Sequence, residues 1–537
     1  MKKIILISVF VSVFSVICLS KENNTQNNVF TDKILVMDKK WFDVNRMNGV
    51  FQNNGIWYFD ASAGDWGLEW PKGSGLSPVF AAGQWIGARV EGQVRIAGVQ
   101  HGGTDFQPGM ILEPFIADNP NNETYRLYSI ESDGRGDWLD WPVDQGAPVD
   151  DIGNPLLLGD RTLYCVWNDL FENMQFGTQP LSIEIHQTVF AFDRADELGD
   201  MQFIKWLLIN KSDMVWDSTY FSIFIDSDIG AAGDDLVGCD TTLNLGFCYN
   251  ATNNDQTYGP APPAIGVDLL QGPIVYNSES KVTLSKQTLS GGREMLPMTS
   301  FIYYNNDDTP QGNPQSGTGA WNYMRGRWRD GTPITEGEKG SNPANPRTMF
   351  VFPGNPETAT GWLDYEENDR RFLMTTGPFT MAAWNDVNTN SQPDIGEPGV
   401  QEITICVFVG RGTNHLNSVT KVKQMDAIAQ SFYDANFLTD KPSDPITFPQ
   451  SCELNQNYPN PFNSSTLVGY HLEIASNVDL SIYNVLGKKV TTLVSERQQA
   501  GQYQVKWDAS DFASGIYLYQ LRTNNGFIQS KKLLLLK

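Results

Sequence analysis

The sequence predicts an all-β protein: a large β-sandwich-type module with one helix near its C-terminal end, followed by a small β-sandwich. Aromatic residues make up 12% of the 537 residues, and 15 of them are Trp. The chain also holds 48 Gly and 29 Pro, which supply many turns. Long helical patterns are nearly absent, whereas short alternating runs of apolar and polar residues recur. Such a composition is typical of packed sheets joined by tight turns.

The overall charge excludes two classes of partner. Asp and Glu number 62 against 38 Lys and Arg, so the formal net charge is −24. Nucleic acids and anionic membrane surfaces both require basic patches, and we expect neither as a partner. The acidic balance suits a secreted protein and calcium binding.

The first 20 residues are predicted to be a signal peptide. Lys2 and Lys3 form a charged start, and residues 4–19 are apolar without a charge. We place the cleavage near Ser20; Cys18 lacks the preceding small residues of a lipid-attachment site. No later stretch approaches the ~20 apolar residues of a membrane span, so the mature chain is expected to have none.

Residues 21–438 are expected to form a large β-rich module, as one unit or as two subdomains. Its first part is dense in aromatic residues among glycines, including Trp41, Trp57, Trp66, Trp70 and Trp85. These rings are interpreted as the core of a sandwich rather than as a sugar-stacking platform, because large aromatic side chains dominate such cores. Residues 80–90 and the return strand after Glu91-Gly92 predict a hairpin.

The first candidate metal site follows three predicted strands, in residues 181–192, 203–210 and 220–225. The next 15 residues form a Gly-rich loop with five carboxylates: Asp226, Asp228, Asp234, Asp235 and Asp240. Like charges this close repel unless a cation or water separates them. Oxygen ligands at this density suit Ca²⁺. The alternative is a solvated acidic turn.

The second candidate metal site has the spacing of an EF-hand loop. Oxygen-bearing side chains fall at positions 1, 3, 5, 9 and 12, and the residue at position 7 offers its backbone carbonyl. The six predicted ligands are Asp386, Asn388, Asn390, Gln392, Asp394 and Glu397. Ser391 replaces the usual Gly at position 6, and residues 403–409 read as a strand, so we expect a calcium-stiffened β-loop. The alternative is a plain Asn/Asp turn.

Two further segments end the large module. A helix is predicted from a cap at Asn417 or Ser418 to about Asn436, because apolar residues recur on one face. Residues 439–453 carry three prolines and read as a stiff linker.

A basic patch lies earlier in this module. Arg325, Arg327 and Arg329 alternate with other residues and would share one face of a strand. There they would pair with the acidic surplus of the chain or bind an anionic glycan.

Five cysteines remain after removal of the signal peptide: Cys165, Cys239, Cys248, Cys406 and Cys452. A disulfide is permitted outside the cytoplasm, and Cys239 and Cys248 are the pair nearest in sequence. Whether they form a bridge or remain two buried thiols is left open by the sequence. There is no Cys-x-x-Cys pair, which argues against zinc ribbons and thioredoxin-like chemistry.

The last stretch, residues 454–537, opens with Leu-Asn-Gln-Asn-Tyr-Pro-Asn-Pro-Phe-Asn and closes with Gly-Ile-Tyr-Leu-Tyr and Lys-Lys-Leu-Leu-Leu-Leu-Lys. Alternation at residues 478–483, 503–507 and 517–521 predicts short strands. In the order of these elements the stretch resembles the type A C-terminal sorting domain of the type IX (Por) secretion system. The resemblance implies an Ig-like sandwich, export across the outer membrane, and the type IX machinery as a partner.

Residues 40–438 resemble an uncharacterised family of large secreted proteins that carry this sorting domain. The resemblance is carried by the acidic loop at 226–240 and by segments 258–266, 321–334, 369–379 and 409–412. That family has no established activity, so the resemblance implies one large module and supplies no catalytic residues.

The usual catalytic signatures are absent from the sequence: there is no Gly-x-Ser-x-Gly, His-Glu-x-x-His or Walker loop. The four histidines include His101 in a His-Gly-Gly-Thr-Asp context. Glu366, Glu367 and Asp369 near Trp362 would suit a glycosidase, which needs only two carboxylates.

We therefore expect a secreted or cell-surface, non-catalytic protein that is structural, adhesive or ligand-binding, is stabilised by calcium, and has a cell-surface glycan as a second partner class. The alternative is a polysaccharide-active enzyme with an aromatic cleft.

Overall fold

The structure is a computed structural model that describes residues 37–437 and 453–537, apart from short gaps. The gaps are residues 151, 172–174, 277–281, 285–286, 290–292, 388, 390–391, 458, 473–475, 485–487, 499–500 and 524–527. The predicted signal peptide, the linker up to residue 452, Cys452, Asn388 and Asn390 therefore lie outside the described residues.

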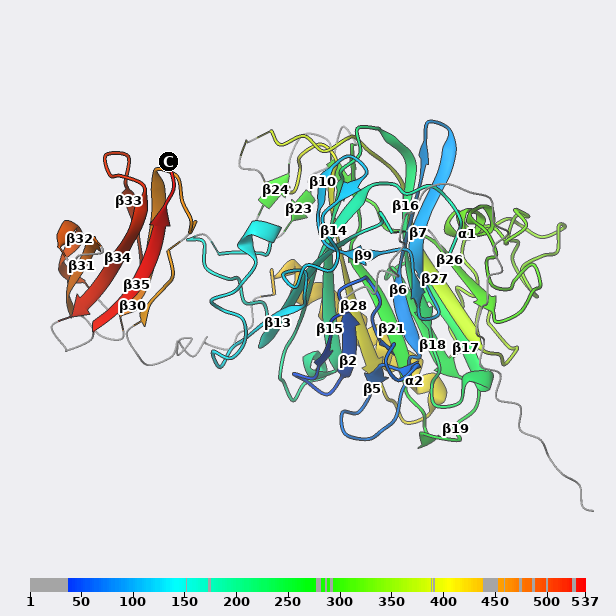
Figure 1. Cartoon of the computed structure of the whole chain (residues 1–537). Helices are drawn as coiled ribbons and strands as arrows, with labels where there is room; N and C mark the ends of the chain where they lie inside the picture. The colour runs from blue at the N-terminus through cyan, green and yellow to red at the C-terminus, as the bar shows by residue number, and fades with distance from the viewer. Residues whose placement is uncertain are drawn as a thin grey trace, which may run out of the picture. The chain divides into compact units, whose positions relative to one another are not determined.

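The large module contains an antiparallel sheet of nine strands, in the order β12-β13-β14-β15-β28-β21-β18-β17 with β9 beside β13 (Figure 1). Its strands are β9 (Gln107–Pro108), β12 (Tyr128–Glu131), β13 (Arg161–Asn168), β14 (Ile183–Ala191), β15 (Met201–Asn210), β17 (Asp235–Asp240), β18 (Leu245–Asn250), β21 (Ala264–Gln271) and β28 (Val400–Gly410). The predicted strands at 181–192 and 203–210 are β14 and β15, which pair with each other.

A second antiparallel sheet of six strands has the order β26-β27-β16-β6-β7-β8. Its strands are β6 (Ala81–Val90), β7 (Gln93–Gln100), β8 (Gly103–Thr104), β16 (Trp216–Asp226), β26 (Met298–Asn305) and β27 (Arg370–Met381). The predicted hairpin is β6 and β7, and its two turn residues, Glu91 and Gly92, both adopt positive φ. Such a turn matches the right-handed twist of the two strands.

Short strands and turns complete the large module. They are β1 (Lys39–Phe42), β2 (Asn48–Gln52), β3 (Phe59–Asp60), β4 (Asp65–Trp66), β5 (Leu68–Glu69), β10 (Ile111–Glu113), β11 (Ile116–Ala117), β19 (Asn254–Asp255), β20 (Gly259–Pro260), β22 (Ile274–Tyr276), β23 (Val282–Leu284), β24 (Gln287–Leu289) and β25 (Arg293–Met295), with short 3₁₀ turns at Val143–Gln145, Glu197–Asp200 and Ala232–Asp234.

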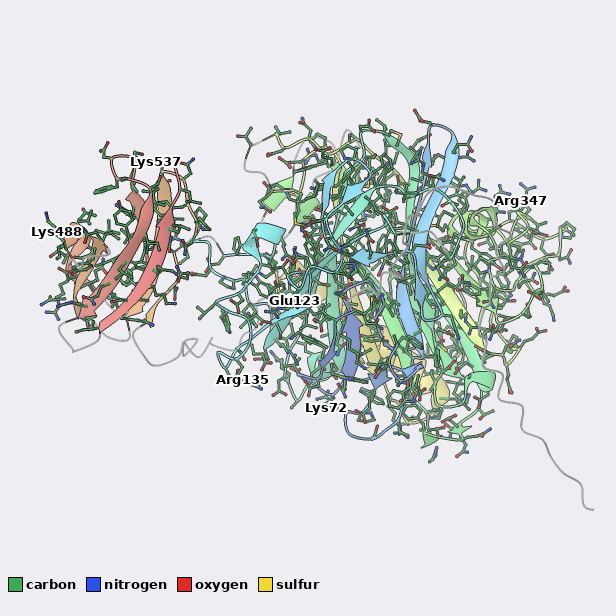
Figure 2. The ribbon with its side chains drawn as sticks, in the orientation of Figure 1. Lys72, Glu123, Arg135, Arg347, Lys488 and Lys537 are labelled. Carbon is green, nitrogen blue, oxygen red and sulfur yellow. The ribbon has the colours of Figure 1, made fainter. Side chains whose placement is uncertain are left out.

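The core lies between the two large sheets. Ile204 of β15, Ile405 of β28 and Phe221 of β16 belong to one continuous buried cluster. Trp57 and Trp85 of the aromatic-rich stretch are fully buried in the same cluster. The interpretation of this stretch as sandwich core is confirmed for these rings, and the all-β prediction is confirmed as a whole. Figure 2 shows the side chains filling the space between the ribbons, with the exposed Lys72, Arg135 and Arg347 at the edge of the module.

The predicted helix is α2 (His415–Asp434), which covers part of the outer face of the nine-stranded sheet. Val422 packs there with Phe408 of β28 and Phe247 of β18. The cap is Asn414 rather than Asn417 or Ser418. The Asn414 side chain accepts a hydrogen bond from the backbone N–H of Asn417, so the helix starts almost one turn earlier than predicted.

A second helix, α1 (Gly317–Met324), was not predicted. It ends immediately before the basic patch, and Arg325 is its C-terminal cap residue, so the patch is not the strand that would place its arginines on one face. The guanidinium of Arg329 donates to the carbonyls of Asp308 and Asn313. Arg327 donates to the carbonyl of Gly331. These donors stabilise the irregular chain between β26 and β27.

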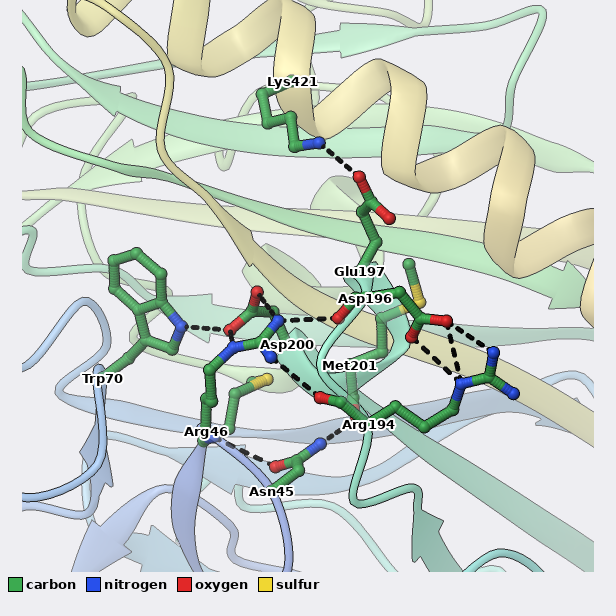
Figure 3. A network of polar contacts seen from close by, with 10 residues as sticks. Asn45, Arg46, Trp70, Arg194, Asp196, Glu197, Asp200, Met201 and Lys421 are labelled. Carbon is green, nitrogen blue, oxygen red and sulfur yellow. Dashed lines mark hydrogen bonds and ion pairs between the residues drawn. The ribbon is translucent and has the colours of Figure 1, made fainter. Parts of the chain in front are cut away.

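A polar network ties the N-terminal strands to the turn before β15 and to α2 (Figure 3). Arg46 donates to both carboxylate oxygens of Asp200, at 2.8 and 2.5 Å, and to the carbonyls of Arg194 and Asp196. Lys421 of α2 lies 2.8 Å from the carboxylate of Glu197 in the same turn. The network therefore joins the N-terminal strands, the turn before β15 and α2, which are far apart in sequence.

Residues 453–537 form a smaller β-sandwich with its own core. One sheet has the order β29-β30-β33 and the other β32-β31-β34-β35. The strands are β29 (Glu453–Leu454), β30 (Ser465–Leu472), β31 (Ser476–Asn484), β32 (Lys489–Gln498), β33 (Gly501–Asp508), β34 (Gly515–Thr523) and β35 (Ile528–Leu535). Tyr470, Ile482 and Trp507 pack in one cluster that draws on both sheets. The strands predicted from alternation are β31, β33 and β34.

Four cysteines fall among the described residues, and all four are buried free thiols. Cys239 pairs across the sheet with Gly246, whereas Cys248 pairs with Val237, so the two thiols are not cross-strand partners. This register explains why no bridge joins them.

None of the helices in the described part of the chain is both long enough and apolar enough to cross a bilayer.

Candidate metal centre

Three carboxylates meet at one end of the six-stranded sheet, and we call Asp226, Asp228 and Asp369 the acidic centre. Asp226 is the last residue of β16, and Asp228 follows it by two residues. Asp369 immediately precedes β27. The two strands pair antiparallel with Asp226 opposite Arg371, so the end of one strand meets the start of the next. Carboxylates 143 residues apart in sequence thereby become neighbours.

The geometry of the acidic centre is compact. One ligand oxygen from each of the three carboxylates lies within 4.8 Å of the others. Arg371 Nε lies 3.2 Å from Asp226 Oδ1, and Arg371 Nη1 lies 3.2 Å from Asp369 Oδ1. His101 Nδ1 lies 3.2 Å from Asp226 Oδ2, and its ring stacks on Phe80 with 5.3 Å between centroids.

The electrostatics leave this centre short of positive charge. Three carboxylates against the one guanidinium of Arg371 give a net charge of −2 when His101 is neutral. Burial, and then the charges of Asp226 and Asp369, raise the pKa of Asp228 to about 7. Asp228 Oδ1 is buried and has no hydrogen-bond partner among the described residues. A divalent cation that prefers oxygen ligands would supply the missing positive charge and would bind the oxygen that lacks a hydrogen-bond donor.

The other predicted ligands of the first loop do not all join the centre. Asp235 is fully buried, and its Oδ2 accepts a hydrogen bond from the N–H of Ile229, which closes the loop. Burial raises the pKa of Asp234 and, more strongly, that of Asp235. Asp240 ends β17, about 16 Å along the strand from Asp235, and lies 2.8 Å from Lys423 of α2. It is therefore an ion-pair partner of α2 and lies outside the acidic centre.

Asp255, the last residue of β19, supports the same loop. Its Oδ2 accepts from the N–H of Ala231 at 3.2 Å. Gly230 adopts φ of +73°, and a Cβ there would lie 2.1 Å from Asp255 Oδ1. Only glycine fits this approach, because it has no side chain to collide with the carboxylate.

The second predicted loop is closed by Glu397. This carboxylate accepts from Trp384 Nε1 at 3.1 Å, from the N–H of Val387 at 3.0 Å and from the N–H of Asp394 at 3.3 Å. Glu397 therefore holds residues from both ends of the loop through hydrogen bonds to protein donors. Asp386, Gln392 and Asp394 are described, whereas Asn388 and Asn390 are not, so the complete ligand set remains a prediction.

The predicted glycosidase residues separate into different environments. Asp369 belongs to the acidic centre. Glu366 lies 3.0 Å from Lys339 in an exposed ion pair, and Glu367 is exposed. His101, suggestive in sequence, lies beside Asp226. Sequence reasoning missed Asp369 as the third carboxylate of the acidic centre and Arg371 as its counter-charge, because only the pairing of β16 with β27 brings them to the loop.

Several hollows lie on the surface of the large module, including the following two regions. One hollow of about 920 Å³ lies over the outer face of β13, β14, β15 and β28. Its floor includes His186, Lys205 and Glu402, and these three groups have charged partners: Lys205 lies 3.1 Å from Glu402, and His186 lies 3.0 Å from Glu184. The second region, a hollow of about 510 Å³ beside one of about 440 Å³, lies around Trp362 and Tyr365.

Comparisons with known proteins inform the C-terminal part of the chain. Residues 456–536 match the family described as "Secretion system C-terminal sorting domain". No curated protein matches the chain.

Among solved structures, a polysaccharide lyase is similar over 66% of this chain at 8% identity, with a TM-score of 0.16. The adhesin domain of Epf from Streptococcus pyogenes is similar over 63% of this chain and 81% of its own, at 5% identity and a TM-score of 0.13. Dimeric latent PorU from Porphyromonas gingivalis is similar over 70% of this chain and 31% of its own, at 10% identity and a TM-score of 0.14. The chain spans about a third of the lyase, with 34% of it covered. At these TM-scores the similarities carry no conclusion about function.

Proposed function

We propose, from the premise that residues 456–536 are a secretion-system C-terminal sorting domain, that the preceding module is a non-catalytic, calcium-stabilised protein of the cell surface or the extracellular space. The sorting domain carries the proposal, because it implies that the chain is a cargo of the type IX system. The partner at this stage is the export machinery. The role of the large module is structural, adhesive or ligand-binding.

The calcium part of the proposal is supported by the acidic centre. Asp228, Asp226 and Asp369 would supply oxygen ligands, and the ion would offset repulsion among carboxylates that protein donors leave partly unpaired. The ion would be structural, since it would tie the loop after β16 to the start of β27. Asp386, Gln392, Asp394 and Glu397, with Asn388 and Asn390, are proposed as a second calcium loop.

Removal of residues 454–537 tests the export assignment. We expect the truncated protein to accumulate in the periplasm of a host with a type IX system, because the machinery would lack its recognition element. Immunoblots of periplasm, cell surface and medium measure the distribution. A surface control is Lys488→Gln, an exposed position of the sorting domain, which should leave export unchanged. Export of the truncated protein at the wild-type level would contradict the assignment.

Substitution of Asp228 tests the calcium assignment. With free calcium at about 100 times its Kd, one site stabilises a protein by about 2.7 kcal/mol. Chelation with EDTA should therefore lower the Tm of the full chain by several degrees, and Asp228→Asn should remove the part of that response that comes from the acidic centre. In calcium-free buffer the same variant should melt no lower than wild type, because it relieves repulsion in the acidic centre. Differential scanning calorimetry measures both effects.

Two further variants complete the calcium experiment. Asp217→Asn removes an exposed carboxylate from the same strand and should keep the full EDTA response. Asp394→Asn reports on the second loop alone. Equal EDTA responses of wild type and Asp228→Asn would argue against a metal in the acidic centre.

The second candidate function is a polysaccharide-active enzyme, favoured by the presence of Asp364 and Glu366 beside Trp362 in one hollow. A glycosidase needs two carboxylates about 5 Å or about 6.5–9.5 Å apart, one of them free to donate a proton. Here Asp364 lies 2.9 Å from Arg370 and Glu366 lies 3.0 Å from Lys339. Release of reducing sugar from polysaccharides, abolished by Glu366→Gln, would establish the enzyme over the non-catalytic protein.

A further inference from the structure

Tyr365 is a large aromatic residue that stands out from the surface. It is 75% exposed, whereas Phe115 and Trp41, the other exposed aromatic residues of the described chain, are 38% and 36% exposed. The hollows of about 510 and 440 Å³ share Trp362, Leu363 and Tyr365, so Tyr365 borders both of them. We call Trp362 and Tyr365 the aromatic ridge. An exposed ring between two hollows offers a stacking surface with room for a ligand on both sides.

The backbone that presents Tyr365 is held from below. Arg370 is 2% exposed, and its Nη2 donates to Asp364 Oδ1 at 2.9 Å and to the carbonyl of Glu366 at 2.6 Å. Its guanidinium also lies over the ring of Tyr303, 4.2 Å from the centroid. Both residues that flank Tyr365 are therefore anchored to one buried cation. The backbone at Tyr365 is thereby fixed, and a Tyr side chain has only two χ angles to order on binding, which favours its use as an anchor.

The second ring of the ridge is also fixed in place. Trp362 Nε1 donates to the carbonyl of Glu338 at 3.1 Å, and the ring meets Phe352 edge-on with 5.1 Å between centroids. Gly340, with φ of +74°, leaves room between Trp328 and Trp362, since a Cβ there would lie 2.7 Å from the first ring and 3.3 Å from the second. The ridge is therefore a formed surface and needs no rearrangement of its backbone.

The polar groups beside the ridge are mixed donors and acceptors. The hollow of about 510 Å³ has a net charge of −1 when all its charged groups are ionised. These groups are Glu338, Lys339, Asp364, Glu366 and Arg370. Arg370 Nε is buried without a hydrogen-bond partner among the described residues. Hydroxyl groups can both donate to carboxylates and accept from cations, so this set suits a polyhydroxylated ligand. The local charge and the chain's net charge of −24 both disfavour a polyanion.

The hollow of about 920 Å³ over the large sheet lacks the stacking element. Tyr164 lines it, but this side chain is 1% exposed and its hydroxyl donates to the carbonyl of Gln145. A hollow without an exposed ring cannot stack a sugar face, so the ridge is the better site for a carbohydrate. The hollow of about 920 Å³ serves as an internal comparison.

We propose that the aromatic ridge of Tyr365 and Trp362 binds a neutral polysaccharide chain, laid across Tyr365 with sugar units in the hollows on either side. The proposal deepens the ligand-binding role in the proposed function by giving it a site and a ligand class. It requires no bond to be made or broken. Export and the response to calcium are measured separately, so failure of one assignment leaves the other testable.

Affinity electrophoresis of the full mature chain tests the proposal. The acidic protein migrates to the anode in native gels, and gels cast with hydroxyethylcellulose, soluble starch, mixed-linkage β-glucan or xylan retard any protein that binds. We expect retardation by at least one of these neutral polymers and none by polygalacturonate. Tyr365→Ala should weaken binding about tenfold or more, because truncation of a central aromatic anchor costs the largest share of binding energy. Tyr365→Phe keeps the ring and should retain binding.

Three controls decide the outcome. Phe115→Ala removes another exposed ring, which is 38% exposed, and should bind like wild type. Val149→Leu narrows the hollow of about 920 Å³ without adding a ring and should also bind like wild type. Melting curves establish that Tyr365→Ala is folded. The proposal is overturned if no neutral polymer retards the protein, if Tyr365→Ala binds as tightly as wild type, if Phe115→Ala loses binding equally, or if only polygalacturonate binds.

Discussion

The ion pair of Arg370 and Asp364 is the most deeply buried one among the described residues. Both side chains are at most 2% exposed, and the two atoms lie 2.9 Å apart. Burial raises the pKa of Asp364, although Arg370 opposes this shift. The pair also receives support from its surroundings, since Arg370 Nη1 donates to Asn305 and Asp364 Oδ2 accepts from the N–H of Val237. The stability of each buried charge therefore depends on the presence of its partner.

Arg370→Met should destabilise the large module by about 3–5 kcal/mol, because it leaves the Asp364 carboxylate buried and uncompensated. Urea denaturation followed by Trp fluorescence measures the change. The double variant Arg370→Met with Asp364→Leu should recover part of the loss, since no charge remains buried.

Arg194→Met is the surface control for that measurement. Its pair with Asp196 is 29% and 41% exposed and should be worth about 1 kcal/mol or less. Equal losses from the two single variants would contradict the role given to burial.

At the level of single residues, the sequence predicted candidate ligands better than it predicted their partners. Asp226 and Asp228 were predicted from local density of carboxylates, and they lie together. Asp369 immediately precedes the neighbouring strand and Arg371 lies on it, and nothing local links them to the loop. Asp240 fell in the same dense stretch, but a six-residue strand carries it away from Asp235. Carboxylates that are neighbours in sequence are therefore neighbours in space only where the backbone between them is not extended.

Helix α2 brings a buried carboxylate against the sheet. Asp426 of α2 is 2% exposed, and Asp268 of β21 is fully buried with neither side-chain oxygen hydrogen-bonded within the described chain. Burial raises the pKa of Asp268 well above its ordinary value, and the charge of Asp426 raises it further. Burial and then Asp240 raise the pKa of Asp426 to about 7, while Lys423 lowers it. Asp434 also raises the pKa of Asp268.

These raised pKa values predict that stability falls as pH rises. The native state holds protons on Asp268 and Asp426 that the unfolded chain releases near pH 4, so the free energy of unfolding decreases from about pH 4 through pH 7 and above. Asp426→Asn should stabilise the protein by about 1–3 kcal/mol at pH 8 and flatten this dependence, because the amide needs no proton. Denaturation by urea at pH 5, 6.5 and 8 measures the effect.

Asp434→Asn is the matched control on the same helix, since Asp434 is exposed and its carboxylate accepts from Gln430. It should change the pH profile less than Asp426→Asn does, because solvent screens the exposed charge that it removes. A profile of Asp426→Asn parallel to that of wild type would refute the assignment to this buried pair.

Secondary structure was predictable where periodicity was strong. Alternation gave β14, β31, β33 and β34, and a turn pair gave the hairpin of β6 and β7. The start of α2 was predicted three residues late, because Asn414, Asn417 and Ser418 are all good cap residues and only the hydrogen bond of Asn414 distinguishes them. Helix α1 was missed since its eight residues, Gly-Thr-Gly-Ala-Trp-Asn-Tyr-Met, include two glycines and are almost all buried.

For the whole molecule, composition predicted the all-β class and motif order predicted the sorting domain. Neither could give the order of strands in the sheets, because antiparallel pairing between β15 and β28, nearly 200 residues apart, leaves no local trace in the sequence. The hollows and the aromatic ridge were unpredictable for the same reason. Which of the 15 Trp and 19 Tyr are exposed depends on the packing of distant loops.

The four buried free thiols have a consequence for how such a protein can be made. Cys165, Cys239, Cys248 and Cys406 all lie in strands of the nine-stranded sheet, and none joins a disulfide. Burial raises the pKa of each thiol, which suppresses the reactive thiolate. The described large module therefore needs no oxidising catalyst to reach its fold. A cytoplasm with reducing conditions should suffice for recombinant production, and the purified protein should tolerate reductant without loss of structure.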